Sequence, residues 1–557
     1  MKKQRLKPAT ALLAAYMLLP TCTALAAPID AGSVLRDSQQ TERKLPERQI
    51  ANVIVAKEIK QPMINDQGFK MFVKSYRISG QDVLDNDELT KLLVSYTNQE
   101  MTMQSLQEAA SILTKYFRDR GYFVAQAYLP VQEINEDTVE IAVLVGRCGD
   151  IILRNQSAVP DAIIMEQLKA IKSGAYIHTD IMERAALLAS DLPGISARTT
   201  LIPGNLPGTT DIVVEAKPKG EVWQGNISEN NWGSRLTGYN QTTLNLILNN
   251  PLKRGDSITA SFNTAGAGQQ TGNIGYHIPL GEGSTLNVNY AKANYELGKD
   301  MASLDVYGTA YTKHADWTYA LRRSRDSNYS VQLGYDHKWL EDKIGSQSTT
   351  TEKWSHATSI GVIGDSTDNM LGGGMNSYSL IWYTGNIGGR TDAGTTLTTG
   401  NWEKTTFNVM RQQYLRERLS LFLSFSGQFA NTNLDSSEKF SLGGANGVRA
   451  YPSGEASGDE AWLGTAELRY TLPANSNGAM WQLATFYDAG TSRLEKNQIT
   501  PGQNSRSLRG AGLGISYIMP GSYAIKANYA WRAGSEDPQS DSTFGKGRLW
   551  LQGVRYF

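Results

Sequence analysis

Few side chains in this sequence have the types and spacing of an enzyme site. Neither a G-x-S-x-G nucleophile motif nor a P-loop occurs. The run Gly510-Ala511-Gly512-Leu513-Gly514 is similar to part of a dinucleotide-binding loop, but no helix follows it, so small residues that clear space in a β-barrel explain it better. The five histidines are scattered and form no paired metal-ligand spacing such as HExxH: His178, His277, His314, His337 and His356. The sequence therefore predicts no enzyme, no cofactor and no metal site.

Three charged residues late in the chain are stronger candidates for a polar site, namely Glu467, Arg469 and Asp488. Over residues 481–490 the side chains alternate in character, which places Phe486 and Asp488 on one face of a strand. If that strand crosses a membrane, Asp488 must face a lumen, because an unpaired carboxylate in lipid is costly. Glu467 and Arg469 are two residues apart and point to the same inner side, so they are expected to join a lumen network.

The overall composition excludes several classes of protein. Lys plus Arg and Asp plus Glu both number 54 among 557 residues, so the net charge of zero offers no field that would collect nucleic acid. Hydrophobic residues make up 40% and charged residues 19%, both below the usual values for soluble chains. No run of ~20 apolar residues follows the N-terminal segment, which excludes a helical membrane protein. A large β-rich protein with an export signal remains.

The start of the chain predicts a secretory signal peptide over residues 1–26. A positive region precedes a short apolar stretch, and Ala24-Leu25-Ala26 gives a small-x-small cleavage pattern. Cys22 leaves a lipoprotein open as an alternative, although Pro20 fits poorly just before a lipidated cysteine. After cleavage the mature chain keeps only Cys148, which excludes an intramolecular disulfide.

Residues 27–68 predict one short helix followed by a linker. The segment Gly32–Lys44 is amphipathic and is expected to end before Pro46, because the residue before a proline is driven out of helical geometry. The rest of this region has the composition of a linker.

Two consecutive regions, 69–147 and 148–218, share the predicted order β-α-α-β-β. In the first, Thr102 caps the longer helix and Gly121 ends it. In the second, the helix Thr179–Leu192 carries its apolar residues on one stripe. The two regions are therefore two α+β modules of about 75 residues each, although their letters are not similar.

Residues 219–557 lose helical periodicity and alternate instead. Segments such as Tyr523–Arg532 have apolar and aromatic side chains on one face and polar or small ones on the other. A soluble antiparallel sandwich shows the same alternation, so this pattern alone does not decide the class. At ~21 residues per strand and connection, the region holds about sixteen strands. An even number closes the sheet and leaves no edge, as a bilayer demands.

The connections favour an outer-membrane barrel. Short turns such as Met519–Ser522 alternate with longer polar segments, and short turns on one rim with long loops on the other are typical of such barrels. The chain also ends on Tyr556-Phe557, as barrel strands do when an assembly machinery must read them. The longer segments are Asp342–Lys353, Asn386–Asn401, Leu434–Glu460 and Thr491–Ser505.

Two motifs carry a resemblance to a known family. Gly447-Val448-Arg449-Ala450-Tyr451, in the longest loop, matches the motif V-R-G-Y and departs from it at Ala450. Phe486-Tyr487-Asp488-Ala489-Gly490 matches F-x-D-x-G on a later strand. With two modules and about sixteen strands, the chain from Pro28 to Phe557 resembles the Omp85 superfamily and, more narrowly, the TpsB transporters of two-partner secretion (the ShlB/FhaC/HecB type).

The resemblance implies a membrane β-barrel at 219–557 with two periplasmic POTRA modules, POTRA 1 at 69–147 and POTRA 2 at 148–218. The loop 434–460 then folds into the lumen, and the N-terminal helix plugs the pore. A merely disordered N-terminus fits the composition of residues 27–68 almost as well.

The resemblance also implies that the loop motif (Val448, Arg449 and Tyr451) meets the wall motif (Phe486, Asp488 and Gly490). Arg449 and Asp488 would form a charge-assisted, bidentate pair, with Glu467 and Arg469 nearby. The plainer alternative is that Arg449 is a solvated loop residue and Asp488 an ordinary lumen side chain. Where the family has glycine with a positive φ, Ala450 is expected to cost ~1 kcal/mol.

By the same resemblance, the protein is expected to secrete an unfolded TpsA-type exoprotein across the outer membrane without ATP. An exposed strand edge in each POTRA module would pair with the extended cargo. The rivals are an Omp85-type assembly factor, which usually has more modules and no plug helix, and an outer-membrane enzyme such as a lipase or protease, for which no nucleophile and base are visible. Other expected partners are outer-membrane lipid or lipopolysaccharide and the barrel-assembly machinery, and the protein is expected to be a monomer.

Overall fold

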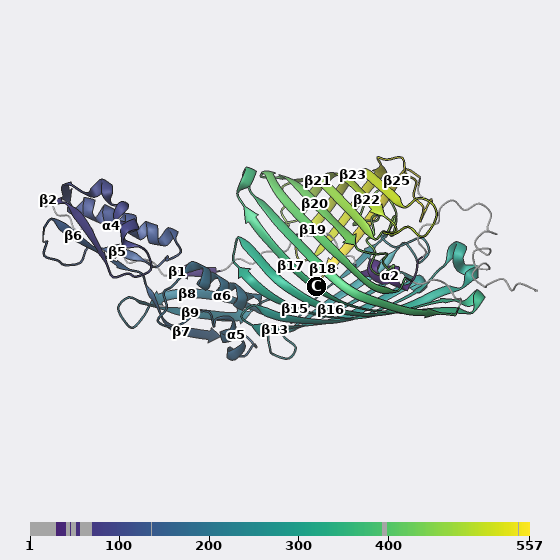
Figure 1. The fold of residues 1–557 in the computed structure, drawn as a ribbon, viewed down its shortest axis with the longest axis horizontal. Helices are drawn as coiled ribbons and strands as arrows, with labels where there is room; N and C mark the ends of the chain where they lie inside the picture. The colour runs from purple at the N-terminus through teal and green to yellow at the C-terminus, as the bar shows by residue number, and fades with distance from the viewer. Residues whose placement is uncertain are drawn as a thin grey trace, which may run out of the picture.

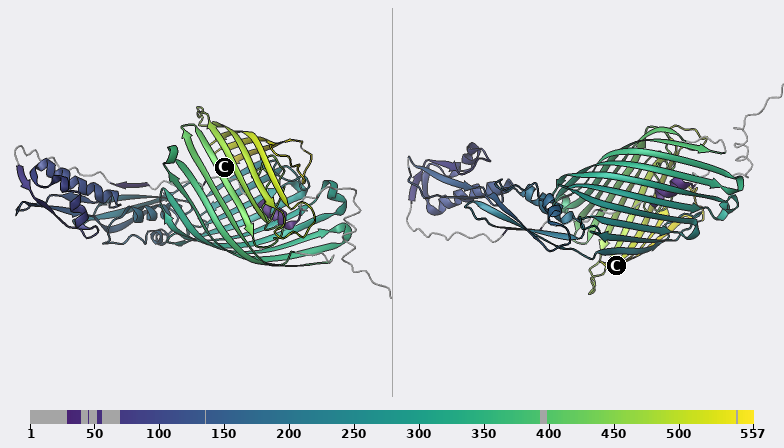
Figure 2. Two further views of the ribbon diagram at one scale, coloured as in Figure 1. Left: turned by 45° about the horizontal axis from the view of Figure 1, so that its top comes forward. Right: turned by 90° about the horizontal axis from the view of Figure 1, so that it is seen from below.

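The computed structural model describes residues 29–39, 45, 52–55, 70–134, 136–392, 398–543 and 545–557, with the backbone alone for 52–55. Two small modules lie at one end of a large closed barrel, and a short helix, α2 (Ala31–Ser38), lies inside the barrel (Figures 1 and 2). Among these residues, no helix is long and apolar enough to cross a membrane.

Sixteen strands close the barrel, each antiparallel to its neighbours in the chain, and the last, β25, pairs with the first, β10. The fold class predicted from the sequence is confirmed. The strands are β10 (Trp223–Asn230), β11 (Gln241–Asn249), β12 (Ser257–Thr264), β13 (Gln269–Gly281), β14 (Ser284–Glu296), β15 (Val306–Arg323), β16 (Ser327–Ile344), β17 (Thr349–Asp368), β18 (Gly374–Thr391), β19 (Gly400–Arg416), β20 (Leu419–Ala430), β21 (Glu460–Thr471), β22 (Met480–Arg493), β23 (Ser505–Met519), β24 (Tyr523–Arg532) and β25 (Gly547–Tyr556).

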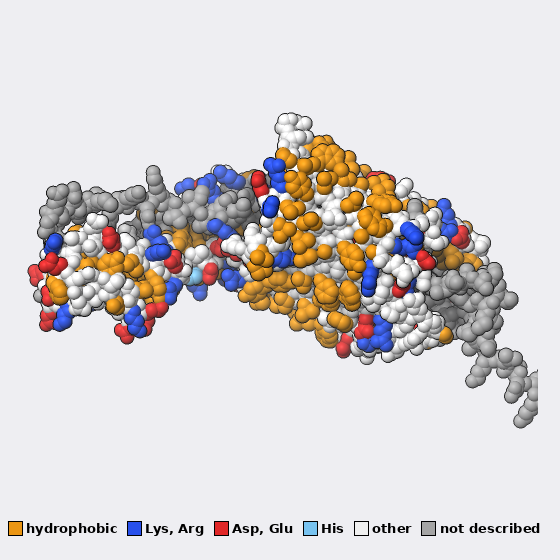
Figure 3. Space-filling model, turned by 90° about the horizontal axis from the view of Figure 1, so that it is seen from above, with side chains coloured by type: hydrophobic (Ala, Val, Ile, Leu, Met, Phe, Trp, Pro, Cys, Tyr) orange, Lys and Arg blue, Asp and Glu red, His pale blue; other side chains and the backbone are white. Residues whose placement is uncertain are grey.

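Alternation along the strands separates the two faces of the barrel. On β16, Leu333, Tyr335 and Trp339 are exposed on the outside, while Leu340, the residue after Trp339, is buried inside. Exposed hydrophobic side chains gather over the barrel wall in the space-filling view (Figure 3). A lipid bilayer is the environment in which such a surface is stable.

The two rims of the barrel differ. The rim beside the modules has short turns, such as residues 417–418 and 520–522, whereas the far rim carries the long loops at residues 431–459 and 533–546. Two segments expected to be loops are partly strand: β16 and β17 run through much of Asp342–Lys353, and β18 continues past Asn386 to Thr391. Their polar side chains extend the strands beyond the apolar band, where both faces meet water.

The first module packs helix α4 against a sheet in the order β3-β6-β5. The Thr102 hydroxyl accepts a hydrogen bond from the N–H of Ser105 (3.2 Å), and Gly121, with φ of 91°, lets the chain leave the helix. Its elements are β2 (Lys70–Val73), β3 (Ser75–Ser79), α3 (Asn86–Lys91), η1 (Val94–Tyr96), β4 (Gln99–Thr102), α4 (Met103–Asp119), β5 (Gln126–Tyr128) and β6 (Thr138–Leu144).

The second module repeats the order and adds a strand that the sequence did not reveal. Strand β1 (Asn52–Val55) lies in the predicted linker, and its backbone pairs in parallel with Arg198–Leu201 of β8. Four residues are too few for a recognisable period, and the open edge of β8 supplies their hydrogen-bond partners. The module's own elements are β7 (Arg147–Asn155), α5 (Asp161–Gln167), α6 (Thr179–Asp191), β8 (Ile195–Pro203) and β9 (Thr209–Pro218).

Charged contacts join the second module to the barrel. Arg323, at the end of β15, donates two hydrogen bonds of 2.7 Å to the Asp191 carboxylate of α6, and Arg325 lies 2.8 Å from Glu183. These arginines fix which rim of the barrel faces the modules.

Candidate functional site

The loop between β20 and β21 folds back into the barrel and carries a core of its own. Val448 and Tyr451 are fully buried there, packed with Leu442 of the same loop and with Phe486 and Leu508 of the wall. The segment 434–460 is called the inner loop below. Apolar packing inside a barrel lumen gives this loop a defined position.

Arg449 meets Asp488 as the two sequence motifs suggested. Its Nε lies 2.8 Å from Asp488 Oδ2 and its Nη2 lies 2.9 Å from Oδ1, so the guanidinium binds the carboxylate through both oxygens. The Arg449 N–H and the Thr465 hydroxyl also donate to this carboxylate. Asp488 is fully buried and Arg449 nearly so, which makes this a desolvated pair and not the solvated arrangement of the alternative.

Glu467 and Arg469 extend this pair along β21. Arg449 Nη1 lies 2.6 Å from Glu467 Oε2, and Arg469 Nε lies 2.8 Å from Glu467 Oε1. The Phe486 ring stacks on the guanidinium, with Arg449 Cζ 3.3 Å from the ring centroid. Arg449, Glu467 and Asp488 are together called the tip anchor.

Small residues make the close approach of the inner loop to the wall feasible. A Cβ at Gly510 would lie 2.6 Å from the Ala450 Cβ, and one at Gly490 would lie 2.5 Å from Leu442 Cδ1. Ala450 does not have a positive φ, so the expected backbone penalty is wrong: the position tolerates a side chain because Gly510 opposite has none.

A second set of loop contacts was not foreseen. The Glu455 carboxylate is fully buried and accepts hydrogen bonds from the N–H groups of Gln539 and Ser540, both at 2.9 Å, while Arg506 Nη1 lies 3.0 Å away. Tyr451 donates its hydroxyl proton to the Glu536 carbonyl at 2.9 Å. The inner loop and the last far-rim loop therefore form one structure.

Helix α2 sits in the lumen against β14, β15 and β16. Its N-cap, Asp30, forms a capping box with Ser33. Val34 and Leu35 are buried against the wall residue Leu340. The N–H of Ala31 donates to the Asp342 carboxylate at 2.7 Å.

The start of the inner loop holds both the helix and the wall. Lys353 Nζ of β17 lies 2.7 Å from Asp435 Oδ2 of the loop and 3.2 Å from Asp30 Oδ2 of the helix. The Ser436 hydroxyl donates to Asp30 Oδ2 at 2.6 Å, and Arg36 donates back to the Ser436 carbonyl at 3.0 Å. Helix, loop and wall meet at this point.

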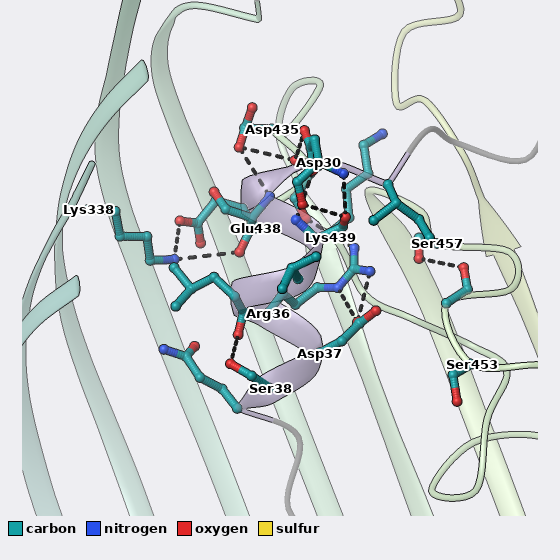
Figure 4. Close-up of a pocket in the computed structure, with 18 of the residues that line it drawn as sticks. Asp30, Arg36, Asp37, Ser38, Lys338, Asp435, Glu438, Lys439, Ser453 and Ser457 are labelled. Atoms are coloured by element: carbon teal, nitrogen blue, oxygen red, sulfur yellow. Dashed lines mark hydrogen bonds and ion pairs between the residues drawn. The ribbon is translucent and has the colours of Figure 1, made fainter. Parts of the chain in front are cut away.

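Two further lysines, Lys338 and Lys404, hold the same part of the loop, and Figure 4 shows Lys338 beside Glu438. Glu438 lies 2.5 Å from Lys338 Nζ and 2.8 Å from Lys404 Nζ, one lysine on each oxygen. Burial alone would raise the pKa of the Glu438 carboxyl, but the two ammonium groups outweigh it and lower that pKa to about 2. The base junction is defined as Asp30, Lys338, Lys353, Lys404, Asp435 and Glu438.

A polar cavity of about 1380 Å³ adjoins the base junction. Its lining includes Asp30, Asp435 and Glu438 but none of the three tip-anchor residues, all of which the structure describes. The base junction is thus close to water, whereas the tip anchor is enclosed by apolar side chains.

No motif or spacing in the sequence predicts the base junction. Lys338, Lys353 and Lys404 occupy inward positions on three different strands, and they look like ordinary lumen lysines until the loop is placed. The scattered histidines are equally uninformative: among the described residues, no group of three or more side chains could hold a metal ion. His314 pairs with Asp316 (3.0 Å) and Asp336 (2.9 Å).

Comparison with known proteins assigns this architecture. The family described as haemolysin secretion/activation protein ShlB/FhaC/HecB matches residues 208–517, and the ShlB-type POTRA domain matches residues 71–146. The heme/hemopexin transporter protein HuxB of Haemophilus influenzae (strain 86-028NP) is 27% identical over 99% of this chain and 98% of its own. The outer membrane transporter CdiB of Escherichia coli is 23% identical over 86% of this chain and 82% of its own.

Solved structures agree on the fold. CdiB from Escherichia coli has a TM-score of 0.71 at 19% identity, covering 89% of this chain and 92% of CdiB. BamA from Haemophilus ducreyi lacking POTRA domains 1–3 has a lower TM-score of 0.51 at 15% identity, covering 87% of this chain and 100% of BamA. Both structures share the fold of this chain, whereas the family match and the curated relatives make the assembly-factor alternative the weaker one.

These matches confirm the function and the location predicted from the sequence. The protein is an outer-membrane transporter of two-partner secretion that works with a TpsA-type exoprotein, with its POTRA modules in the periplasm. The chain belongs to the haemolysin secretion/activation protein family ShlB/FhaC/HecB.

Proposed function

We propose that α2 and the inner loop together close the secretion pore, and that the exoprotein opens it by displacing them. The observation that carries this proposal is Ser436, which joins the two segments: its hydroxyl donates to Asp30 and its carbonyl accepts from Arg36. The helix cannot leave the lumen without breaking contacts with the base of the loop. Release of one segment therefore weakens the seat of the other.

The contacts of α2 suit a removable plug. Its buried apolar face has only two large side chains, Val34 and Leu35, which at ~1.5–3 kcal/mol each is a modest hold. The remaining contacts are hydrogen bonds and ion pairs with Lys353 and Asp342, beside the polar cavity. Water or a passing polypeptide can replace such partners.

A tether tests the plug directly. In the double variant Ala31→Cys, Asp342→Cys, a short thiol crosslinker would join the helix to the wall at a place where backbone and carboxylate are now 2.7 Å apart. Secretion should stop on crosslinking and return when the linker is cleaved. Each single variant, treated identically, is the matched control, and undiminished secretion by the tethered protein would exclude plug release as a step.

We further propose that the periplasmic modules capture the cargo through strand pairing. The pairing of β1 with β8 supports this, because it is an extended segment added to the edge of the second module's sheet. A proline placed in the exposed edge strand β5 should weaken cargo binding, since it removes a hydrogen-bond donor from the ladder. The control is a proline at an equally exposed position of α3, which is not part of a sheet edge. If it lowers cargo binding as much as the β5 proline does, the loss is not due to strand pairing.

The nature of the cargo is a finer proposal. Because HuxB, a heme/hemopexin transporter protein by name, aligns over nearly the whole chain, we propose an exoprotein of that class in preference to a contact-dependent toxin. Co-expression with each kind of exoprotein, and measurement of secretion into the medium, distinguishes the two.

The domain division is also a proposal: signal peptide 1–26, plug and linker 27–68, POTRA 1 at 69–147, POTRA 2 at 148–218 and barrel 219–557. The POTRA match to residues 71–146 supports the bounds proposed for POTRA 1. Residues 1–26 lie outside the described residues, and N-terminal sequencing should find the mature protein starting near Ala27 or Pro28. Assembly by the barrel machinery, a monomeric state and contact with lipopolysaccharide complete the proposal.

A further inference from the structure

Four basic side chains form a row on the lipid-facing surface of the barrel. They are Lys292 on β14, Lys313 on β15, His337 on β16 and His356 on β17, called the basic row below. In the strand register, Lys313 is opposite His337, and His337 is opposite His356. The two imidazoles stack, with ring centroids 6.2 Å apart and planes at 7°.

Alternation places this row on the outside. On β16, His337 lies between Tyr335 and Trp339, both exposed, and on β17 His356 follows the exposed Trp354 by two residues. The inward neighbours, such as Lys338, contact the inner loop instead. Lys292 is among the residues that border the lumen cavity, but its Nζ lies 5.2 Å from the ring centroid of Tyr311, its opposite residue on the outer face. The basic row therefore faces lipid and not the lumen.

Aromatic residues give the depth of the row. Tyr311, Trp339 and Trp354 lie one outward position farther from the periplasmic rim than Lys313, His337 and His356, whereas Lys292 is directly opposite Tyr311. The Arg323 end of β15 marks the periplasmic rim. The rings of Tyr311 and Trp339 are 6.2 Å apart, and Lys292 Nζ is 5.2 Å from the Tyr311 ring centroid. Aromatic side chains gather where a barrel meets the headgroups. The basic row thus lies at the boundary of the outer leaflet.

Among the described residues, no carboxylate forms an ion pair with the two lysines of the basic row. Farther out on the same surface, Lys343 pairs with Glu341 (2.8 Å) and Arg390 with Glu352 (2.6 Å). Within the described residues neither Lys292 nor Lys313 makes an ion pair. An ammonium facing lipid is stable only where it reaches an anion or water.

Another part of the barrel surface is different. The outer faces of β20 and β21 present Leu423, Phe425 and Trp462, and hydrophobic side chains gather over the barrel wall in the view from above (Figure 3). The basic row is therefore a local feature of β14–β17 and not a general property of the barrel surface.

We propose that the basic row binds the phosphorylated headgroup of lipopolysaccharide in the outer leaflet. Lys292 and Lys313 donate to the phosphate oxygens, the stacked imidazoles offer further N–H groups, and the rings of Tyr311 and Trp339 pack against the sugar. This inference deepens the lipid contact in the proposed function, and it is independent of how the pore opens.

The test uses the purified full-length transporter. The variant Lys292→Met, Lys313→Met removes both ammonium groups but keeps the apolar stems, and it eases folding in lipid because it deletes lipid-facing charge. Each protein in detergent is titrated with deep-rough lipopolysaccharide carrying both lipid A phosphates. Bound lipid is counted by native mass spectrometry, and heat-modifiable migration verifies a folded barrel.

The double variant should bind this lipopolysaccharide about 30-fold more weakly, as two charges beside an anionic surface imply. Lys343→Met, which removes an already paired ammonium, should bind within about twofold of the unaltered protein. Lipid A stripped of its phosphates should bind the unaltered protein as weakly as the intact lipid binds the double variant.

Three results would overturn the proposal. One is equal binding by the double variant and the unaltered protein. Another is equal binding of phosphatidylglycerol, which would assign the row to anionic lipids in general. The third is competition by millimolar inorganic phosphate, which would assign it to a free anion.

Discussion

The two polar centres inside the barrel hold the same inner loop by different means. At the tip anchor a single arginine binds two carboxylates inside an apolar cluster. At the base junction three lysines from three strands bind Asp435 and Glu438 of the loop and Asp30 of the helix beside a polar cavity. One centre is dry and the other is close to water.

The difference concerns reversibility. A guanidinium has a planar fork of donors that matches a carboxylate in one geometry, whereas an ammonium is a point charge that exchanges partners readily. A desolvated pair whose partner is lost leaves an uncompensated charge, but a pair beside water is rehydrated. We therefore expect the tip of the loop to stay fixed through small motions, while the base and the plug helix release first.

The largest expected effect is at the tip anchor. Arg449→Ala leaves Asp488 buried without a cationic partner and leaves Glu467 with Arg469 alone, which should destabilise the seated loop by ~3–5 kcal/mol. The closed barrel should still reach the outer membrane at near-normal abundance, with secretion nearly abolished and channel conductance raised.

Two variants control this prediction. Arg449→Lys keeps the charge but loses the two-point fit, so its secretion defect should be intermediate. Asp488→Ala should resemble Arg449→Ala, and combining the two should add little, because both remove one interaction. Strictly additive defects would mean that Arg449 and Asp488 act separately.

The sequence predicted the tip anchor better than the base junction for a physical reason. Asp488 lies at an inward position of a strand whose alternation is plain, and Arg449 lies in a short motif that the family resemblance pairs with it. The partners of Glu438, by contrast, are single lysines on β16 and β19, and no local pattern distinguishes them from other lumen lysines. Contacts between such distant segments depend on how deeply the loop enters the barrel, which neither periodicity nor motif spacing specifies.

The same limit applies to the fold. The sixteen strands and the two modules can be predicted from hydrophobic periodicity and segment lengths. The alternation recurs throughout residues 219–557, and the order β-α-α-β-β occurs twice. Strand β1 consists of four residues and exists because β8 offers an edge. The strand ends beyond Asp342 and Asn386 are rich in polar residues and glycine, so their composition predicts loops where the structure has strands.

The next largest effect is expected at the base junction, whose hold on the inner loop should weaken in acid. Because the seated loop lowers the pKa of Glu438 from 4.5 to about 2, its anchoring is fully present above pH 4.5 and is lost as the pH falls toward 2. The shift corresponds to about 3 kcal/mol. Channel conductance in planar bilayers should be constant from pH 7 to 5 and rise below 4.5.

Matched variants isolate Glu438 from other carboxylates. Glu438→Gln should have raised conductance at neutral pH and no further rise on acidification. Glu460→Gln removes a carboxylate at the other end of the loop, which pairs with the partly exposed Lys496, and it should keep the unaltered pH profile. An acid response that survives in Glu438→Gln would place the titrating group elsewhere.

A smaller effect is expected at the plug. Asp30→Ala removes the helix cap, the ion pair with Lys353 and the hydrogen bond from Ser436, which together should loosen α2 by ~2 kcal/mol. More frequent channel openings should follow, with normal barrel abundance. Asp37→Ala is the matched control, since Asp37 pairs with Arg36 of its own helix. Equal opening rates in both variants would mean that the N-cap contacts do not retain the helix.

The smallest effect tests how closely the tip fits the wall. Ala450→Gly restores the residue usual in the family motif, but the backbone here needs no positive φ, so the change should destabilise the seated loop by only ~1 kcal/mol. Gly510→Ala should be worse, because its new Cβ would lie 2.6 Å from that of Ala450. Combining the two changes should recover most of the secretion lost in Gly510→Ala, since the methyl group then occupies the space that Ala450 vacates. If the double variant secretes no better than Gly510→Ala alone, the contact between Ala450 and Gly510 does not set the position of the loop tip, and the packing around Phe486 and Leu442 would have to explain it.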